Sequence, residues 1–236
     1  MAVSFDFGGD VALVTGVGGA LGSSVAEAFL DAGATVCGVD LTEPDSEDFL
    51  LERPDRIDLY KVDLTDEAQV EDVVTSVVGA HGRLDSLANV AGTWRGGDAV
   101  ESTDADLFDF LVGVNLKTTF LATKHALPHL QDTEGAVINV SSRSSLEGGS
   151  GDALYRATKA GVRILTESVA EENLGTVRAN AVMPSVIDTP MNRKMMSGAD
   201  HSSWVDPDDI AAVVAFLCSD AAVPTSGASV PVYGEA

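Results

Sequence analysis

Short apolar runs alternate along the chain with segments whose apolar residues recur at helical spacing. The strand-like runs are 10–15, 35–39, 57–62, 84–90, 135–140, 177–182 and 229–232. Between them, apolar side chains follow a period of about 3.6, and helices are expected at 21–32, 70–78, 107–130, 153–174 and 210–217. This alternation is typical of βαβ units. The sequence therefore predicts an α/β fold in one domain over residues 1–236, with a doubly wound, mostly parallel seven-stranded sheet and helices on both faces.

The net charge indicates which partners are disfavoured and what salt concentration the protein is suited to. Against 14 Lys and Arg stand 37 Asp and Glu, a net charge of −23 that is spread along the chain. This excess disfavours a nucleic-acid partner and favours a halophilic protein, because salt near 1 M shortens the Debye length to about 3 Å and screens self-repulsion. An ordinary acidic enzyme is the alternative. Without a long apolar run or a basic leader, we expect a cytoplasmic protein with no membrane partner.

The cysteines and histidines give no metal signature by their spacing. Cys37 and Cys218 lack a C-x-x-C partner, and both are expected to be buried as small hydrophobic residues. His125 and His129 stand four residues apart but without a third ligand nearby in sequence, which is more typical of a solvated helix face. The sequence predicts no metal.

A glycine-rich loop joins the first strand to its helix. Gly16, Gly18 and Gly22 lie in residues 15–22, where a glycine backbone and a free helix N-terminus suit a pyrophosphate. Asp40 follows at the end of the second strand, where a carboxylate accepts hydrogen bonds from a ribose 2′-hydroxyl and repels a 2′-phosphate. These residues predict NAD(H) in preference to NADP(H), unless Arg53 or the nearby Arg56 turns toward the ribose.

A tyrosine and a lysine share one face of the helix at 153–174. Tyr155 and Lys159 are four residues apart, so a positive charge stands near a phenol. Such a charge favours the phenolate and makes the phenol a workable acid and base for a hydroxyl or a carbonyl. The other interpretation is a half-buried tyrosine beside a lysine that extends to solvent.

Motifs in a common order make nearly the whole chain resemble the short-chain dehydrogenase/reductase family. Residues 15–22 are similar to its T-G-x-x-x-G-x-G loop, with Ala20 where the middle glycine is usual. Residues 89–92 resemble its N-N-A-G motif, with Val90 in place of the second asparagine. Asp63 is similar to the acid that holds the adenine after the third strand.

The catalytic motifs of that family also have counterparts here. Asn115 matches its helix asparagine, and Ser142, thirteen residues before Tyr155, matches its catalytic serine. Residues 184–189 resemble the P-G-x-x-x-T segment that clamps the nicotinamide, with Ser185 in place of glycine.

The resemblance implies a Rossmann fold, a nicotinamide cofactor and a role for each matching residue. Tyr155 would be the general acid and base, and Lys159 would lower its pKa and bind the nicotinamide ribose. Ser142 would polarise the substrate oxygen, and Asn115 would order a proton-relay water. The implied cofactor-binding residues are Gly16, Gly19, Ala20, Leu21, Gly22, Asp40, Leu41, Asp63, Leu64, Asn89, Ala91, Gly92, Tyr155, Lys159, Pro184, Ile187 and Thr189.

Four stretches resemble one subgroup, dihydropteridine reductase. They are residues 91–97, 121–125, 188–194 and 199–204, which fall where the family builds its substrate pocket. Trp94, Ser144 and Met191 are the candidate substrate residues, and a short substrate loop is expected at about 190–206. Its methionines either close over a substrate or simply pack. Ser142 and Asn115 depart from that subgroup, which generally lacks both.

The leading interpretation is an NAD(H)-dependent enzyme that interconverts a secondary alcohol and a ketone. The alternatives are a dihydropteridine-reductase-like activity and a non-catalytic NAD-binding module. By the same resemblance, a small-molecule substrate and a homo-oligomer, a tetramer or a dimer built through the two long helices, are expected.

Overall fold

The computed structural model describes residues 5–235, and within this range seven strands form a single sheet in the order β3-β2-β1-β4-β5-β6-β7. Every neighbouring pair is parallel, which confirms the predicted doubly wound α/β fold. The strands are β1 (Val11–Thr15), β2 (Thr35–Asp40), β3 (Asp58–Lys61), β4 (Ser86–Asn89), β5 (Ala136–Val140), β6 (Arg178–Pro184) and β7 (Ser229–Val232).

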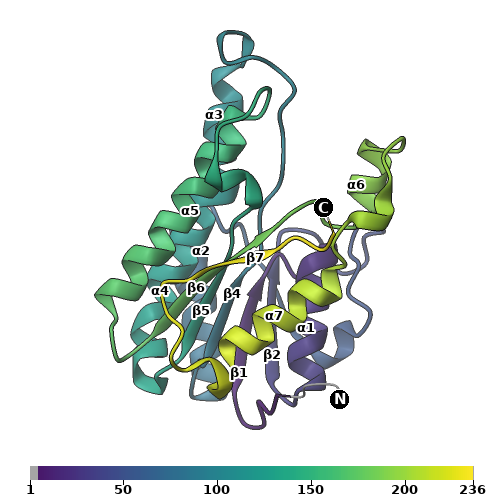
Figure 1. Ribbon diagram of the computed structural model, residues 1–236. Helices are drawn as coiled ribbons and strands as arrows, with labels where there is room; N and C mark the ends of the chain where they lie inside the picture. The colour runs from purple at the N-terminus through teal and green to yellow at the C-terminus, as the bar shows by residue number, and fades with distance from the viewer. Residues whose placement is uncertain (1–4, 236) are drawn as a thin grey trace.

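Helices cover both faces of the sheet (Figure 1). They are α1 (Ala20–Asp31), α2 (Glu67–His81), α3 (Ala105–Leu111), α4 (Thr118–Thr133), α5 (Ala153–Glu172), α6 (Pro190–Met195) and α7 (Pro207–Cys218). Side chains of β1 alternate between two cores: Ala12 and Val14 face α1 and α7, whereas Val11 and Leu13 face α2, α4 and α5. Because both faces are covered, the central strands are apolar throughout, as the continuous runs in the sequence predicted.

The long helix expected at 107–130 is interrupted. A π-helical turn, Val112–Lys117, separates α3 from α4 and contains Asn115. Two side chains compete for backbone carbonyls just after it, since Thr118 Oγ1 donates to Val114 O at 2.8 Å and Thr119 Oγ1 donates to Asn115 O at 3.1 Å. Such turns recur at functional sites, and neither the turn nor its position was predicted.

Two connections contain elements that the sequence did not predict. The short α6 lies inside the substrate loop expected at 190–206, where Thr189 caps it by accepting a hydrogen bond from the backbone N–H of Asn192 at 3.1 Å. The connection from β2 to β3 is irregular apart from a 3-10 turn at Pro54–Arg56. Its turn residues and lack of periodicity gave no element to predict.

The topology fixes where a ligand fits. The strand order reverses between β1 and β4, and in open α/β sheets ligands bind beyond the carboxyl ends of the strands at this switch point. Figure 1 shows α3, the start of α5 and α6 all projecting at one end of the molecule. Thr15, Asp40, Asn89 and Val140 are the last residues of their strands and bring the predicted motifs to that edge.

Within residues 5–235, the helices are all too short or too polar to span a lipid bilayer.

Candidate active site

A cleft of about 1800 Å³ lies at the carboxyl edge of the sheet and gathers the predicted site residues. Those that line it are Gly16, Gly19, Ala20, Leu21, Gly22, Asp40, Leu41, Asp63, Leu64, Ala91, Gly92, Trp94, Ser142, Ser144, Tyr155, Lys159, Pro184, Ile187, Thr189 and Met191. Two predicted residues, Asn89 and Asn115, are buried and do not line the cleft. The cleft is large enough for a dinucleotide together with a small substrate.

The glycine-rich loop fits a phosphate group because side chains would fill it. Gly16 has a φ of 69°, and a Cβ placed on it would stand 2.8 Å from the Cα of Ala91. A Cβ on Gly22 would stand 1.9 Å from the carbonyl oxygen of Gly16. Gly19, at the N-cap of α1, supplies no side-chain cap, so the helix N-terminus offers its N–H groups to an anion in the cleft.

Asp40 is held at the mouth of this loop. Its carboxylate accepts hydrogen bonds from the backbone N–H groups of Gly18, at 2.9 Å, and Thr42, at 2.8 Å. The β2–β3 connection folds back over the loop, where Leu50 N donates to Gly18 O at 2.8 Å, and a Cβ on Gly18 would meet the ring of Phe49 at 2.5 Å. This covering segment was not predicted.

The covering segment makes this end of the cleft acidic. Glu47 and Asp48 line the cleft together with Asp40. The four cations in the lining, Lys117, Arg143, Lys159 and Lys194, all come from other parts of the described chain. Acidic composition alone could not locate these carboxylates, because the path of an irregular connection is set by its tertiary contacts.

Lys159 is buried and donates a hydrogen bond from Nζ to the carbonyl oxygen of Val140 at 2.8 Å. Ser141 Oγ donates in return to the carbonyl oxygen of Lys159 at 2.8 Å, so α5 is fixed to the end of β5 from both sides. Burial lowers the pKa of Lys159 from 10.5 to about 8. A lysine that extends to solvent, the other interpretation of the sequence, is not what the structure shows.

Asn115 joins the π turn to the loop after β4. Its Oδ1 accepts from Thr93 N at 2.8 Å, and its Nδ2 donates to Thr93 O at 3.0 Å and to Thr158 Oγ1 at 3.3 Å. A Cβ on Gly92 would stand 2.9 Å from Asn115 Oδ1 and 3.0 Å from Lys159 Nζ. Only a residue without a side chain lets these two polar groups approach the same backbone.

Tyr155 and Ser142 are joined by a side-chain hydrogen bond at the cleft. Ser142 Oγ also accepts from Ser144 N at 3.1 Å, which fixes the serine at the start of a 3-10 turn. Burial is the largest influence on the phenol and raises the pKa of Tyr155; the bond to Ser142 lowers it, the charge of Asp152 raises it and that of Arg156 lowers it.

The direction of this pKa shift differs from the sequence-based expectation that Lys159 would lower the pKa of Tyr155. The reason is the position of the ammonium, which is directed to the carbonyl of Val140, together with the burial of the phenol. In this structure the hydroxyl therefore keeps its proton at neutral pH, the form that a general acid requires.

Two predicted cofactor residues have structural contacts of their own. Asn89 Nδ2 donates to Thr123 Oγ1 at 3.0 Å and to Asn139 Oδ1 at 2.8 Å, which places its amide in the core between β4, β5 and α4. The Thr189 hydroxyl caps α6. Conversely, Thr15 was not among the predicted site residues. Its Oγ1 accepts hydrogen bonds from Val90 N at 3.0 Å and from Ala91 N at 3.2 Å, which ties the end of β1 to the loop after β4.

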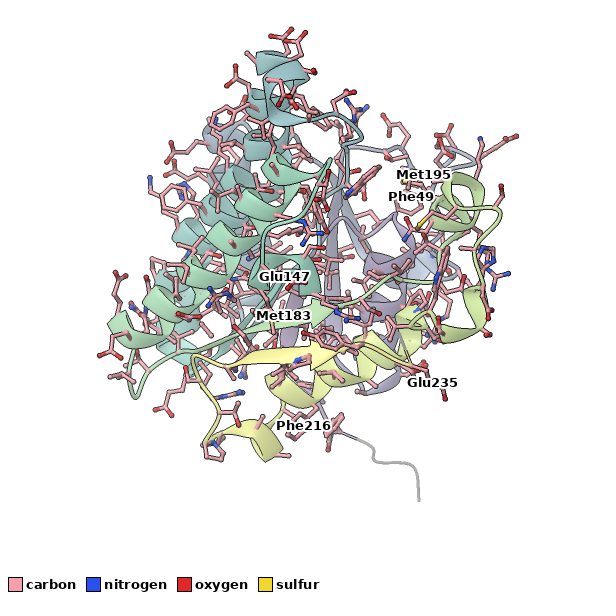
Figure 2. All side chains as sticks on the ribbon, turned by 45° about the horizontal axis from the view of Figure 1, so that its top comes forward. Phe49, Glu147, Met183, Met195, Phe216 and Glu235 are labelled. Atoms are coloured by element: carbon pink, nitrogen blue, oxygen red, sulfur yellow. The ribbon has the colours of Figure 1, made fainter. Side chains whose placement is uncertain are left out.

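The predicted substrate residues lie in the more open part of the cleft. Trp94 and Met191 are 43% and 63% exposed, and Ser144 is half-buried. Figure 2, which brings the top of the molecule forward, shows Met195 on α6 and Phe49 on the β2–β3 connection at one end of the molecule. Trp204 lies outside the lining and packs on His201, with ring centroids 4.3 Å apart.

Residues 10–200 match the family model of the short chain dehydrogenases. The chain belongs to this family. It is 33% identical over 96% of its length to 3-oxoacyl-[acyl-carrier-protein] reductase of Thermotoga maritima, of which it covers 97%. It is also 33% identical over 98% of its length to meso-2,3-butanediol dehydrogenase of Serratia marcescens, of which it covers 95%.

Among solved structures, that of ElxO with bound NADP superposes with a TM-score of 0.88 at 27% identity, covering 95% of this chain and 97% of that one. These relatives establish an oxidoreductase family that acts on CH–OH groups with a nicotinamide cofactor. They do not show the expected similarity to dihydropteridine reductase.

Replacing Lys159 by methionine is expected to stabilise the protein at pH 7. The folded-state pKa of about 8 lies below the ordinary 10.5, so the unfolded chain binds more protons between these values and the native lysine costs most below pH 8. Because the carbonyl of Val140 loses its partner, the net gain should be about 1 to 3 kcal/mol.

Urea unfolding of wild type and Lys159→Met at several pH values measures this gain, which should shrink as the pH approaches 10.5. Lys124→Met, at a half-exposed lysine on α4, is the matched control and should show no such pH dependence. If Lys159→Met raised the free energy of unfolding equally at pH 7 and near pH 10.5, the result would contradict the burial of a titrating ammonium.

Proposed function

We propose that this protein is an NAD(H)-dependent dehydrogenase/reductase that interconverts a secondary alcohol and a ketone. The observation that supports it most is the pair of Tyr155 and Ser142, which are hydrogen-bonded to each other at the cleft with a buried Lys159 one helical turn away. Two hydroxyl groups that face one point can both contact one substrate oxygen.

Each residue has a distinct part in the reaction. Ser142 donates a hydrogen bond to the substrate carbonyl oxygen, and Tyr155 gives its proton to that oxygen in reduction and takes it back in oxidation. Lys159 and Asn115 pack around Gly92 beside the tyrosine, and by the family resemblance they would connect it to solvent through an ordered water. The nicotinamide supplies the hydride when bound.

The dinucleotide would lie along the glycine-rich loop and the carboxyl edge of the sheet. Gly16, Gly19 and Gly22 would receive its pyrophosphate at the N-terminus of α1, and Asp40 its adenosine ribose. A 2′-phosphate on that ribose would meet the carboxylates of Asp40, Glu47 and Asp48. This acidic surrounding supports NAD(H), although a structural neighbour binds NADP.

One of the two arginines that would weaken this preference is engaged elsewhere. Arg53 pairs with Glu27 and with Asp31, the latter at 2.7 Å, and so ties the β2–β3 connection to α1. Its guanidinium is therefore paired with protein carboxylates and not directed toward a 2′-phosphate of the cofactor.

Turnover of a ketone panel with NADH tests the proposed chemistry. Tyr155→Phe should retain NADH binding and lose at least about 10²-fold in kcat, because the phenol proton is absent. Ser142→Ala should lose about 10²- to 10³-fold, because the carbonyl oxygen loses a fixed donor. NADH binding without turnover of any ketone by the wild type would instead favour a non-catalytic NAD-binding module.

The same variants separate the remaining alternative. Reduction of a quinonoid dihydropterin needs less carbonyl polarisation, so Ser142→Ala should cost little on that substrate if the protein acts as a dihydropteridine reductase. The exposed Trp94 beside the cleft is the feature that suits a flat ring.

Replacing Asp40 by asparagine should move cofactor preference toward NADPH. The amide removes one negative charge and keeps one of the two acceptor oxygens, so it can accept from the N–H group of Gly18 or of Thr42 but not from both. Fluorescence titration at fixed salt should show the ratio of NADPH to NADH affinity rise about tenfold, equivalent to about 1.4 kcal/mol.

Glu43→Gln is the matched control, because Glu43 lies outside the lining and pairs with Lys61 at 2.5 Å. An unchanged ratio in Asp40→Asn would contradict the assignment of the ribose to Asp40.

We further propose a cytoplasmic homo-oligomer, a tetramer or dimer formed through the long helices. Its support is the family resemblance together with exposed apolar side chains: Phe108 on α3, Phe120 on α4 and Ile164 on α5 are about half exposed. Light scattering at working salt should give a multiple of the 24.4 kDa chain mass, and a single-chain mass would contradict the proposal.

Stability should increase with salt, in keeping with a halophilic protein. Figure 2 shows side-chain oxygen atoms around much of the outline of the molecule, and the chain carries a net charge of −23. Screening weakens this repulsion, so the thermal unfolding midpoint should rise as KCl is raised from about 0.1 M to about 2 M. An equally stable protein at low salt would contradict the halophilic interpretation.

A further inference from the structure

Three side chains with metal-binding groups meet on the face of the sheet covered by α2. Cys37 on β2 is the parallel partner of Asp58 on β3, so the two side chains lie next to each other. His81 is the last residue of α2, which ends there because Gly82 adopts a φ of 77°. One ligand atom from each of the three residues lies within 4.8 Å of the other two.

The imidazole in this cluster lacks a well-formed hydrogen bond at Nε2. His81 Nε2 is buried, and among residues 5–235 no group completes a hydrogen bond with it. It stands 3.0 Å from a carboxylate oxygen of Asp58 without the geometry of a hydrogen bond. An imidazole nitrogen beside a carboxylate and a thiol is a typical donor set for a metal ion, and burial of a polar atom without a hydrogen-bond partner is otherwise costly.

We propose that Cys37, Asp58 and His81 bind a divalent transition-metal ion, with zinc as the preferred ion. Sulfur, imidazole nitrogen and carboxylate oxygen together suit Zn²⁺ better than Mg²⁺ or Ca²⁺, which prefer oxygen alone. Binding replaces the thiol proton of Cys37 by a sulfur–metal bond, and the proton leaves to solvent.

The geometry needs only a small adjustment to reach this state. Bond lengths of about 2.0 to 2.3 Å place tetrahedral ligand atoms about 3.3 to 3.8 Å apart. Separations of up to 4.8 Å must therefore contract by no more than about 1 Å, and the 3.0 Å between His81 Nε2 and the Asp58 oxygen must widen by about 0.3 Å. Asp58 can supply this movement, because its side chain is 57% exposed. The same exposure leaves the fourth position to water.

The site is separate from the cleft, since none of its three residues lines it. Its ligands come from β2, from the edge strand β3 and from the end of α2. A bound ion would therefore fix an edge strand of only four residues to its neighbour and to the covering helix. We assign it a stabilising role without a part in the reaction.

Cobalt substitution tests the site, because Co²⁺ bound by a thiolate absorbs in the near ultraviolet and Co²⁺ held by carboxylates alone does not. Untagged, reduced protein is titrated with CoCl₂ and then with ZnCl₂. We expect one Co²⁺ per chain, an absorption band that Zn²⁺ abolishes, and a rise of the thermal unfolding midpoint with Zn²⁺ that EDTA reverses.

Cys218→Ser is the matched control, because Cys218 is the other buried cysteine and lies outside the cluster. It should keep the band, whereas Cys37→Ser should lose it at least about tenfold in amplitude. His81→Gln leaves both thiols in place at a partly exposed position, and should weaken Co²⁺ binding about tenfold or more.

Circular dichroism verifies that each variant is folded. The proposal is overturned if the wild type binds Co²⁺ without the thiolate band, if it shows no stoichiometric binding, or if the band survives in folded Cys37→Ser. None of these outcomes depends on turnover, so a failure of the metal-site proposal can be distinguished from a failure of the proposed enzyme activity.

Discussion

A side chain at position 92 would occupy the space in which the polar groups of the site meet. The backbone of Gly92 lies so close to Asn115 and Lys159 that a Cβ would stand about 3 Å from the polar end of each. The π turn presents Asn115 to this point, and the end of β5 receives Lys159 through the carbonyl of Val140. The side of the cleft that holds the candidate catalytic residues is therefore built around one residue that has no side chain.

Burial shifts the pKa values of the ionisable groups around this point. An ammonium in the interior is costly, and its hydrogen bond to a carbonyl offsets only part of that cost. The pKa of Lys159 falls, while the pKa of the neighbouring Tyr155 rises, because both charged forms lose water. Such paired shifts in one cleft are typical of sites that move protons. The site thus has a tyrosine that retains its proton and can donate it.

Periodicity and motif order were sufficient to predict the sheet and to bring most of the candidate site residues to one cleft. The strand expected at 229–232 is β7, and Asp40 ends β2 beside the glycine-rich loop as its place in the sequence implied. What escaped prediction depends on tertiary contacts. The π turn at Asn115, the path of the acidic β2–β3 connection and the buried position of the Asn89 amide have no local pattern. Likewise, Cys37, Asp58 and His81 are far apart in sequence and meet only after folding.

Gly92→Ala is the most direct test of this account, with Gly79→Ala on α2 as the matched control, since a Cβ at Gly79 meets nothing within 4 Å. The measurement is kcat for NADH-dependent reduction of a ketone accepted by the wild type, with urea unfolding on the same samples. We predict that Gly92→Ala folds and loses about 10²-fold in kcat, because the added Cβ displaces the polar ends of Asn115 and Lys159 from their positions, whereas Gly79→Ala keeps wild-type turnover. Wild-type turnover in folded Gly92→Ala would contradict the account.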